Sequence, residues 1–253
     1  MKKLLVIFYI ILLSCQNNEK PLMKQYCTTS MLDYYDNGKI KTITNLLNDS
    51  TSVTINYYES GIIESTSRRK NGLRSGSCLK YDEKGNLFLI ESYYLDKKHG
   101  SELKYNKGIL NYLQQYIIVG DSSYLNQYIF YDDFGNIRKE RSRFYSILYE
   151  TFGEEIRVNQ NEEIEFRISY PDVINQKYQH QIVTGEFDNF FNIINSKSLD
   201  TVLVNGIFHQ LTYSFGEIGV HWVSGIILSS YTDINGAVQC EKMYFSIPFT
   251  VIE

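Results

Sequence analysis

Alanine and proline are scarce in this sequence. Its 253 residues include three prolines and a single alanine, Ala237. Because alanine is the strongest helix former, its scarcity disfavours a helical fold. Aromatic residues are abundant instead, with 22 tyrosines and 14 phenylalanines, and these residue types favour β-strands. An A/T-rich genome would bias the composition in the same direction. The composition and the strand patterns described below together predict an all-β protein.

The chain also lacks a surplus of basic residues. Its 25 lysines and arginines are outnumbered by 29 aspartates and glutamates, which gives a formal net charge of −4 at pH 7. Removal of Lys2 and Lys3 with an N-terminal signal segment would change this charge from −4 to −6. Nucleic-acid binding is driven by a basic surface, so we expect no nucleic-acid partner.

No known catalytic motif is present. The sequence has no Gly-x-Ser-x-Gly, no phosphate-binding glycine loop and no His-Glu-x-x-His. The stretch GDSS at 120–123 contains serines but lacks the strand-to-helix context of a nucleophile. The pairs Glu154–Glu155 and Glu162–Glu163 lie in a charged linker, where we expect them to be solvated. The chain is therefore predicted to be no enzyme and to use no cofactor; an envelope enzyme with a site scattered across strands is an alternative.

The histidines and cysteines do not form a metal motif. His209 and His221 lie on consecutive predicted strands, but a metal site would need further ligands, and none stand out. We expect ordinary structural positions for the four histidines, which are His99, His180, His209 and His221. Besides Cys15, the cysteines are Cys27, Cys78 and Cys240, an odd number whose spacing suits neither a disulfide scaffold nor zinc. These three cysteines could form one disulfide and leave one free thiol. Our preferred interpretation is that all three are isolated, partly buried thiols.

The N-terminus has the anatomy of a signal peptide. Two lysines precede ten apolar residues, 4–13, which is too short a run to span a bilayer. The following Leu12-Leu13-Ser14-Cys15 resembles the bacterial lipobox. The resemblance implies cleavage before Cys15 and acylation of its thiol and new amino group, and two or three acyl chains anchor a protein firmly. An ordinary cleaved signal with a chance cysteine is the alternative.

We therefore assign residues 1–14 to a lipoprotein signal peptide and 15–30 to a flexible tether. Asn17 stands where aspartate would mark retention at the inner membrane, which favours the outer membrane of a bacterial cell envelope. The membrane partner is then bound through the acyl chains on Cys15. Whether the protein faces the periplasm or the cell surface stays open.

A phrase of tyrosine, an acidic or polar residue and glycine recurs five times. The intervals between its glycines are 23, 24, 23 and 27 residues. The tyrosine–glycine pairs are Tyr35–Gly38, Tyr58–Gly61, Tyr81–Gly85, Tyr105–Gly108 and Tyr131–Gly135. Aspartate and asparagine start turns, and glycine supplies the positive φ that such turns require. Each phrase is predicted to be a hairpin tip, so the array is an antiparallel β-meander.

These phrases resemble the variant MORN repeat over residues 31–149. The resemblance implies an elongated β surface for contact with protein or lipid, and some family members are labelled antitoxins. The stretch IIVGDSSYLNQ at 117–127 is expected to hold a longer turn, since the last interval is the longest. The repeated tyrosines could form an aromatic ladder on one face, but a structural role in packing copy on copy is the favoured interpretation.

The sequence pattern changes over the last hundred residues, 150–253, where the tyrosine–glycine phrase no longer occurs. About seven short apolar or alternating runs are separated by glycine, asparagine and aspartate, which is typical of a β-sandwich. The stretch GVHWVSG at 219–225 resembles a strand near the end of bacterial immunoglobulin-like domains. On that strand Val220, Trp222 and Ser224 would share one face and His221 and Val223 the other, and Trp222, the only tryptophan, is the expected core residue.

These patterns together predict a non-catalytic interaction or scaffold protein. A lipid anchor, a β-repeat array and an immunoglobulin-like β-sandwich would present surfaces for a protein partner of unknown identity. An acidic chain suits anionic lipid poorly, so a protein partner is preferred over lipid or glycan. The alternative is an antitoxin or immunity-like protein that neutralises one specific toxin.

Overall fold

The computed structural model describes residues 29–148, 156–169, 179–204, 208–232 and 235–253. The predicted signal peptide and lipobox, Cys27, and the pair Glu154–Glu155 lie outside the described residues. Within the described ranges there are 18 strands, one 3₁₀ turn and no α-helix, which confirms the predicted all-β fold class. No helix in these ranges is long and apolar enough to cross a membrane.

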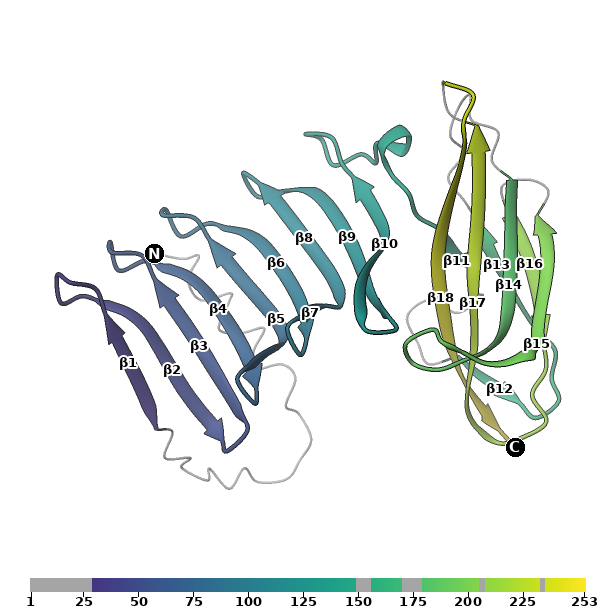
Figure 1. Ribbon diagram of the computed structural model, residues 1–253, viewed down its shortest axis with the longest axis horizontal. Helices are drawn as coiled ribbons and strands as arrows, with labels where there is room; N and C mark the ends of the chain where they lie inside the picture. The colour runs from purple at the N-terminus through teal and green to yellow at the C-terminus, as the bar shows by residue number, and fades with distance from the viewer. Residues whose placement is uncertain (1–28, 149–155, 170–178, 205–207, 233–234) are drawn as a thin grey trace.

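The first region is one antiparallel sheet in which each strand pairs with the next along the chain (Figure 1). Its order is β1-β2-β3-β4-β5-β6-β8-β9-β10, with the short β7 paired to β6. The strands are β1 (Ser30–Tyr34), β2 (Ile40–Asn48), β3 (Thr51–Tyr57), β4 (Ile63–Lys70), β5 (Leu73–Tyr81), β6 (Leu87–Tyr94), β7 (Lys97–Lys98), β8 (Gly100–Asn106), β9 (Ile109–Val119) and β10 (Ser122–Phe130). This is a β-meander of successive hairpins.

The tyrosine–glycine phrases lie at hairpin tips, and most share one turn geometry. The Gly38 amide donates to the Tyr35 carbonyl (2.9 Å), and the Tyr35 amide donates to the Lys39 carbonyl (2.8 Å). Gly38 has φ +78°, a conformation that glycine adopts without steric cost. Tyr58–Gly61 repeats this pattern, and at the third and fifth tips the same bonds start one residue later, at Asp82 and Asp132.

The fourth tip and the stretch after it differ from the rest. Lys107 and Gly108 both have positive φ, 50° and 82°, in a two-residue turn of the type that matches the twist of paired strands. The expected longer turn within 117–127 is wrong. A two-residue connection, Gly120–Asp121, joins β9 to β10, and the extra residues lengthen both strands.

Tyrosine hydroxyls link successive copies of the phrase. The Tyr35 hydroxyl donates to the Tyr57 carbonyl (2.6 Å), and the Tyr58 hydroxyl donates to the Tyr81 carbonyl (2.7 Å). In both cases the acceptor lies 22 or 23 residues further along the chain. These bonds tie the first hairpin tip to the second and the second to the third.

The second region consists of two smaller sheets that share one core. The order is β11-β13-β16 in one sheet and β12-β18-β17-β14-β15 in the other, with β12 parallel to β18. The strands are β11 (Ser146–Leu148), β12 (Arg157–Asn159), β13 (Ile164–Ser169), β14 (Gln179–Phe187), β15 (Ile193–Val204), β16 (Phe208–Tyr213), β17 (Gly219–Thr232) and β18 (Val238–Ile252). The second region is thus a separate β structure of two small sheets, and the larger of them is mixed.

The core lies between these two sheets. Its buried members come from both of them: Val158, Ile164, Ile168, Ile182, Leu211, Val223, Ile227, Met243, Phe245, Ile247, Phe249 and Val251. The expectation that Trp222 belongs to the core is wrong, because Trp222 is 60% exposed whereas Val223 is 4% exposed. The aliphatic face of β17 turns inward and packs on Phe245 and Ile247 from the neighbouring β18, which leaves Val220 and Trp222 outside.

The two regions meet at the last strand of the meander. After β10 a 3₁₀ turn, Lys139–Arg141, leads the chain back alongside it, where Arg143 pairs with Tyr128. The buried Asn126 side chain donates to the Tyr244 carbonyl (2.8 Å) and accepts from the Tyr244 amide (2.6 Å). This side chain therefore occupies the place of a neighbouring strand at the edge of β18, and the Tyr145 hydroxyl also donates to the Tyr244 carbonyl (2.7 Å).

Candidate binding surfaces

One face of the meander carries a continuous apolar row. Cross-strand partners follow one another from β1 to β10 as Leu32, Ile43, Ile55, Thr66, Leu79, Ile90, Leu103, Leu113 and Ile129. Only Thr66 interrupts the aliphatic side chains of this apolar row. Leu32 is exposed and the other eight are half-buried, so neighbouring members shield one another only in part.

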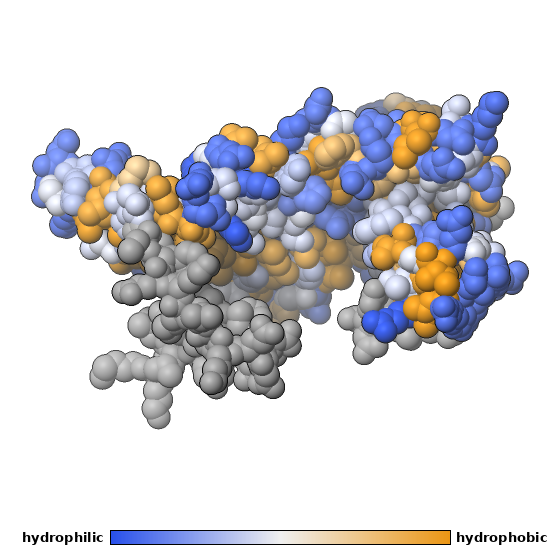
Figure 2. Space-filling view, turned by 90° about the horizontal axis from the view of Figure 1, so that it is seen from below, coloured by the Kyte–Doolittle hydropathy of each residue, from blue (hydrophilic) through white to orange (hydrophobic). Residues whose placement is uncertain are grey.

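No second layer covers this sheet among the described residues. Its strands contact one another within the sheet, and β10 also contacts β18 of the second region. The buried apolar cluster lies wholly in the second region. Hydrophobic side chains form separate patches between polar ones along the length of the molecule (Figure 2). The meander is thus a single-layered sheet with accessible apolar side chains.

The opposite face is polar and is partly buried by its own side chains. Thr54, Ser67, Cys78 and Glu91 are directly paired across adjacent strands, and each is less than a tenth exposed. Cys78 has a free thiol, as does the exposed Cys240, so neither forms the disulfide that was left open. Short polar side chains here allow longer neighbours to fold over them.

A charged network dominates this polar face. The Lys98 ammonium pairs with Glu102 and lies 3.2 Å from Glu91 Oε1, and both carboxylates are 5% exposed. The Tyr112 hydroxyl donates to Glu102 Oε1 (2.7 Å). Lys80 Nζ lies 2.9 Å from Glu91 Oε2, an ion-pair contact without hydrogen-bond angles. These contacts join five strands, β5 to β9.

Burial and charge act in opposite directions on the pKa values of this network. Burial favours the neutral acid, but the ammonium groups of Lys80 and Lys98 outweigh it and lower the pKa of Glu91. Burial opposes the charged form of Lys98, yet its bonds to Glu102 and Glu91 raise the pKa of Lys98 above the ordinary value. Glu91 and Lys98 are thus held in their charged states at neutral pH, as expected for a structural ion pair.

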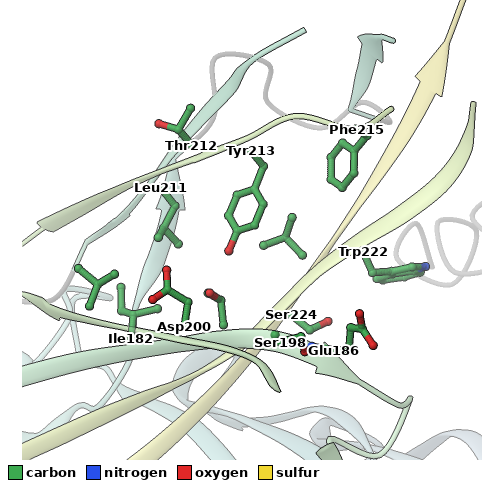
Figure 3. Close-up of a pocket in the computed structure, with 14 residues that line it drawn as sticks. Ile182, Glu186, Ser198, Asp200, Leu211, Thr212, Tyr213, Phe215, Trp222 and Ser224 are labelled. Carbon is green, nitrogen blue, oxygen red and sulfur yellow. Dashed lines mark hydrogen bonds between the residues drawn. The ribbon is translucent and has the colours of Figure 1, made fainter. Parts of the chain in front are cut away.

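A cleft opens between the two sheets of the second region. It has a volume of about 380 Å³ and lies between β14, β15, β16 and β17 (Figure 3). Its lining comprises Ile182, Thr184, Gly185, Glu186, Ser198, Asp200, Val202, Leu211, Thr212, Tyr213, Phe215, Trp222, Val223 and Ser224. Asp200 and Tyr213 point toward each other across it, and Trp222 stands at one end (Figure 3).

The charge of this cleft has one sign. Glu186 and Asp200 are exposed carboxylates, and the lining includes no lysine, arginine or histidine. Tyr213, Phe215 and Trp222 add three aromatic rings. Carboxylates beside aromatic rings suit a cation or a hydroxyl-rich ligand, and they repel an anion.

The histidines occupy separate places. His99 is exposed next to the Tyr94 ring, and His180 is buried with Nδ1 2.8 Å from the Ser229 hydroxyl. His209 lies on β16 and His221 on β17, in different sheets, and the His221 ring stacks on Phe215 with centroids 4.8 Å apart. Throughout the described ranges, no three histidine, cysteine, aspartate or glutamate side chains cluster as metal ligands.

The cleft and the apolar row were not found from the sequence. Their residues are common strand residues that become neighbours only through strand pairing. The one accessible signal was the lone tryptophan, which was assigned to the core. Glu162 and Glu163 are both exposed, as expected, and Glu162 accepts a hydrogen bond from the Asn159 amide (2.9 Å). In comparisons with known proteins, no family model, no curated protein and no solved structure matches this chain.

Proposed function

We propose that this chain is a lipid-anchored protein of the bacterial envelope, most simply at the outer membrane, that binds a protein partner without catalysis. The apolar row is the observation that carries the proposal. A single-layered sheet that keeps an aliphatic row half-exposed over nine strands has a large surface suited to a partner. Strands about 4.8 Å apart give the row a length on the order of 40 Å, the scale of a standard protein interface.

The resemblance to MORN repeats supports the same function, because such arrays present elongated β surfaces. The charged network on the opposite face lies within the sheet and keeps Glu91 and Lys98 ionised, which is consistent with support of the sheet rather than with catalysis. The lipobox-like Leu12-Leu13-Ser14-Cys15 would hold the sheet near the membrane, where a partner in the same compartment is concentrated.

The test is a pull-down from solubilised native membranes with the lipidated, C-terminally tagged protein, cross-linking and mass spectrometry. The variant Ile55→Thr/Ile90→Thr removes apolar surface from the row but keeps the β-branched shape that strands favour. We expect a single stoichiometric partner with wild type. Enrichment of that partner should fall about tenfold with the variant, since each lost apolar contact contributes on the order of 1 kcal/mol.

The matched control is Ile63→Thr/Ile109→Thr, which makes the same chemical change at exposed positions beside hairpin tips. It should retain the partner. Equal retention by both variants would place the interface elsewhere, and no enriched protein with wild type would contradict the proposed function.

Anchoring is tested separately with Cys15→Ser. Loss of the acylated cysteine should move the protein from the membrane to the soluble fraction and leave the signal segment uncleaved. Unchanged size and membrane association would exclude lipidation.

A further inference from the structure

The cleft in the second region opens beside a free strand edge. In the order β12-β18-β17-β14-β15, β15 is the last strand, and among the described residues it pairs only with β14. It spans 12 residues, its register with β14 is irregular between Asn195 and Asp200, and its regular stretch is 200–204. The side chains of Ile194 and Leu203 are each 66% exposed. The free edge of the regular stretch is a template to which another extended chain can add.

The side chains of β15 connect this edge to the cleft. Asp200 and Val202 alternate along the regular stretch of the strand and line the cleft, so they share one face, and Ser198 lines the cleft from the irregular part. Thr184 of β14 is opposite Asp200 and lines the cleft as well. A strand added beyond β15 would therefore direct every second side chain toward the same cleft. The Cβ atom of each such residue would lie about 5 Å from the Cβ atom of the opposite residue on β15.

The residues that line the cleft indicate which kind of side chain the added strand could insert there. Asp200 and Glu186 are acidic, and no basic residue among the lining side chains neutralises them. The aromatic rings of Tyr213 and Trp222 can hold a cation over their faces, and tryptophan does so best. A lysine or arginine side chain satisfies both features, whereas an acidic one would be repelled.

We propose that β15 is a docking edge for an extended segment of a partner protein, which adds as a further strand and inserts a lysine or arginine side chain into the cleft beside Asp200. This inference deepens the proposed function, on which it rests, by naming a second contact and the chemistry of the partner. The bound segment supplies backbone hydrogen bonds to the edge, and its basic residue supplies specificity.

The lone tryptophan provides a direct measurement. Since Trp222 is the only tryptophan and lines the cleft, the intrinsic fluorescence of the full chain reports on binding there. The probes are two short acetylated peptides of alternating threonine and valine, one with a central lysine and one with a central glutamate. We expect a saturable change in emission with the lysine peptide and binding at least about tenfold weaker with the glutamate peptide.

Asp200→Asn should weaken binding of the lysine peptide about tenfold and remove most of its dependence on salt, because the ion pair at the edge is lost. Glu83→Gln, an exposed acid in a meander turn, is the matched control and should bind like wild type. Hydrogen exchange should slow across 193–204 when the lysine peptide is bound, which a cation held only in the cleft would not cause.

Three results would overturn the inference: equal affinity for both peptides, no response to either, or no protection of β15. A response to a neutral oligosaccharide and not to the peptides would do so too, by identifying a sugar site. The proposed function is judged apart from this. If membrane pull-downs retain the partner with Asp200→Asn but lose it with Ile55→Thr/Ile90→Thr, the inference fails and the proposed function stands.

Discussion

At the scale of single residues, Gly225 on β17 illustrates how tightly the sandwich is packed. A Cβ atom at this position would lie 2.6 Å from the Phe245 ring and 2.7 Å from the Val183 carbonyl oxygen. The backbone oxygen belongs to the paired strand β14 and cannot move without breaking the ladder. Glycine is therefore required by close approach and not by turn geometry.

We predict that Gly225→Ala destabilises the protein by about 2–4 kcal/mol, because overpacking against backbone is costly. Chemical denaturation followed by far-UV circular dichroism measures the loss. Gly216→Ala is the control, because the atom nearest to the added Cβ would be 3.6 Å away. Its free energy of unfolding should be close to that of wild type. Equal effects of the two substitutions would show that the contacts at Gly225 are readily relieved.

His180 makes the stability of the sandwich depend on pH. Burial lowers the pKa of His180 to about 4, so the folded protein holds it neutral where the unfolded chain binds a proton. The folded pKa lies below the unfolded value of about 6.5, so unfolding takes up a proton between these limits. Stability is therefore complete above about pH 6.5 and falls as the pH drops toward 4.

We predict that wild type loses about 1–3 kcal/mol of unfolding free energy from this site between pH 7 and pH 4. His180→Gln keeps a polar side chain near Ser229 but removes the titration, and it should show a shallower pH dependence. Urea titrations over this range measure the difference. His99→Gln, at an exposed turn, should retain the wild-type slope, and a His180→Gln slope equal to wild type would contradict the assignment.

At the scale of the elements, local turn chemistry accounts for the hairpin tips of the meander. Asp132 shows why acidic residues recur there, since its Oδ1 accepts from the amides of Phe134 (2.9 Å) and Asn136 (2.8 Å). Asp82 caps the third tip in the same way, with the amides of Lys84 and Asn86. These contacts are made within a few residues, so a sequence pattern can predict them.

The network around Lys98 is an interaction between elements. We predict that Lys98→Ala destabilises the meander by about 2 kcal/mol at pH 7, because two buried carboxylates lose their shared cation and Lys98 itself is partly exposed. The folded pKa of Glu91 is lowered, so its stabilisation is present above the unfolded pKa and is lost as the pH falls through the folded pKa. The deficit of the variant should therefore shrink below about pH 4.

Unfolding free energies at neutral and acid pH measure this deficit. Lys70→Ala removes an exposed lysine from β4 of the same sheet and serves as the control. A deficit that does not change with pH would indicate lost packing of the lysine stem rather than lost charge pairing.

At the scale of the whole molecule, contacts around Tyr244 of β18 form the centre of the junction between meander and sandwich. Asn126 satisfies both backbone groups of Tyr244, and the Tyr124 hydroxyl donates to the Lys242 carbonyl (2.7 Å). The Tyr124 and Tyr244 rings meet edge to face with centroids 5.2 Å apart. Together they connect the last meander strand to the edge of β18.

We predict that Asn126→Ala weakens the stabilising interaction between the two regions by about 2–3 kcal/mol. The substitution leaves a buried amide and carbonyl of Tyr244 without the Asn126 side chain as partner. Small-angle scattering should show a wider distribution of shapes, and calorimetry should separate the unfolding of the two regions. Tyr124→Phe removes a single hydrogen bond and should have a smaller effect. A variant Asn126→Ala that unfolds in one unchanged transition would show that other contacts hold the junction.

The sequence by itself determined the fold class, the order of hairpins and the position of most tips. These follow from residue propensity and from bonds between residues close in the chain, as at Tyr35–Gly38. Alternation along β17 also correctly separated Val220, Trp222 and Ser224 from His221 and Val223.

Only the tertiary structure decided which of two faces is buried, and against what. Trp222 lies outside because Val223 and Ile227 belong to a core that includes Ile168 and Leu211 of the opposite sheet, an arrangement that alternation alone cannot specify. The same holds for the apolar row, whose members become neighbours through strand register, and for the cleft, which exists only because two sheets of different width face each other. Local chemistry sets the strands and turns, and long-range pairing creates the surfaces that can bind.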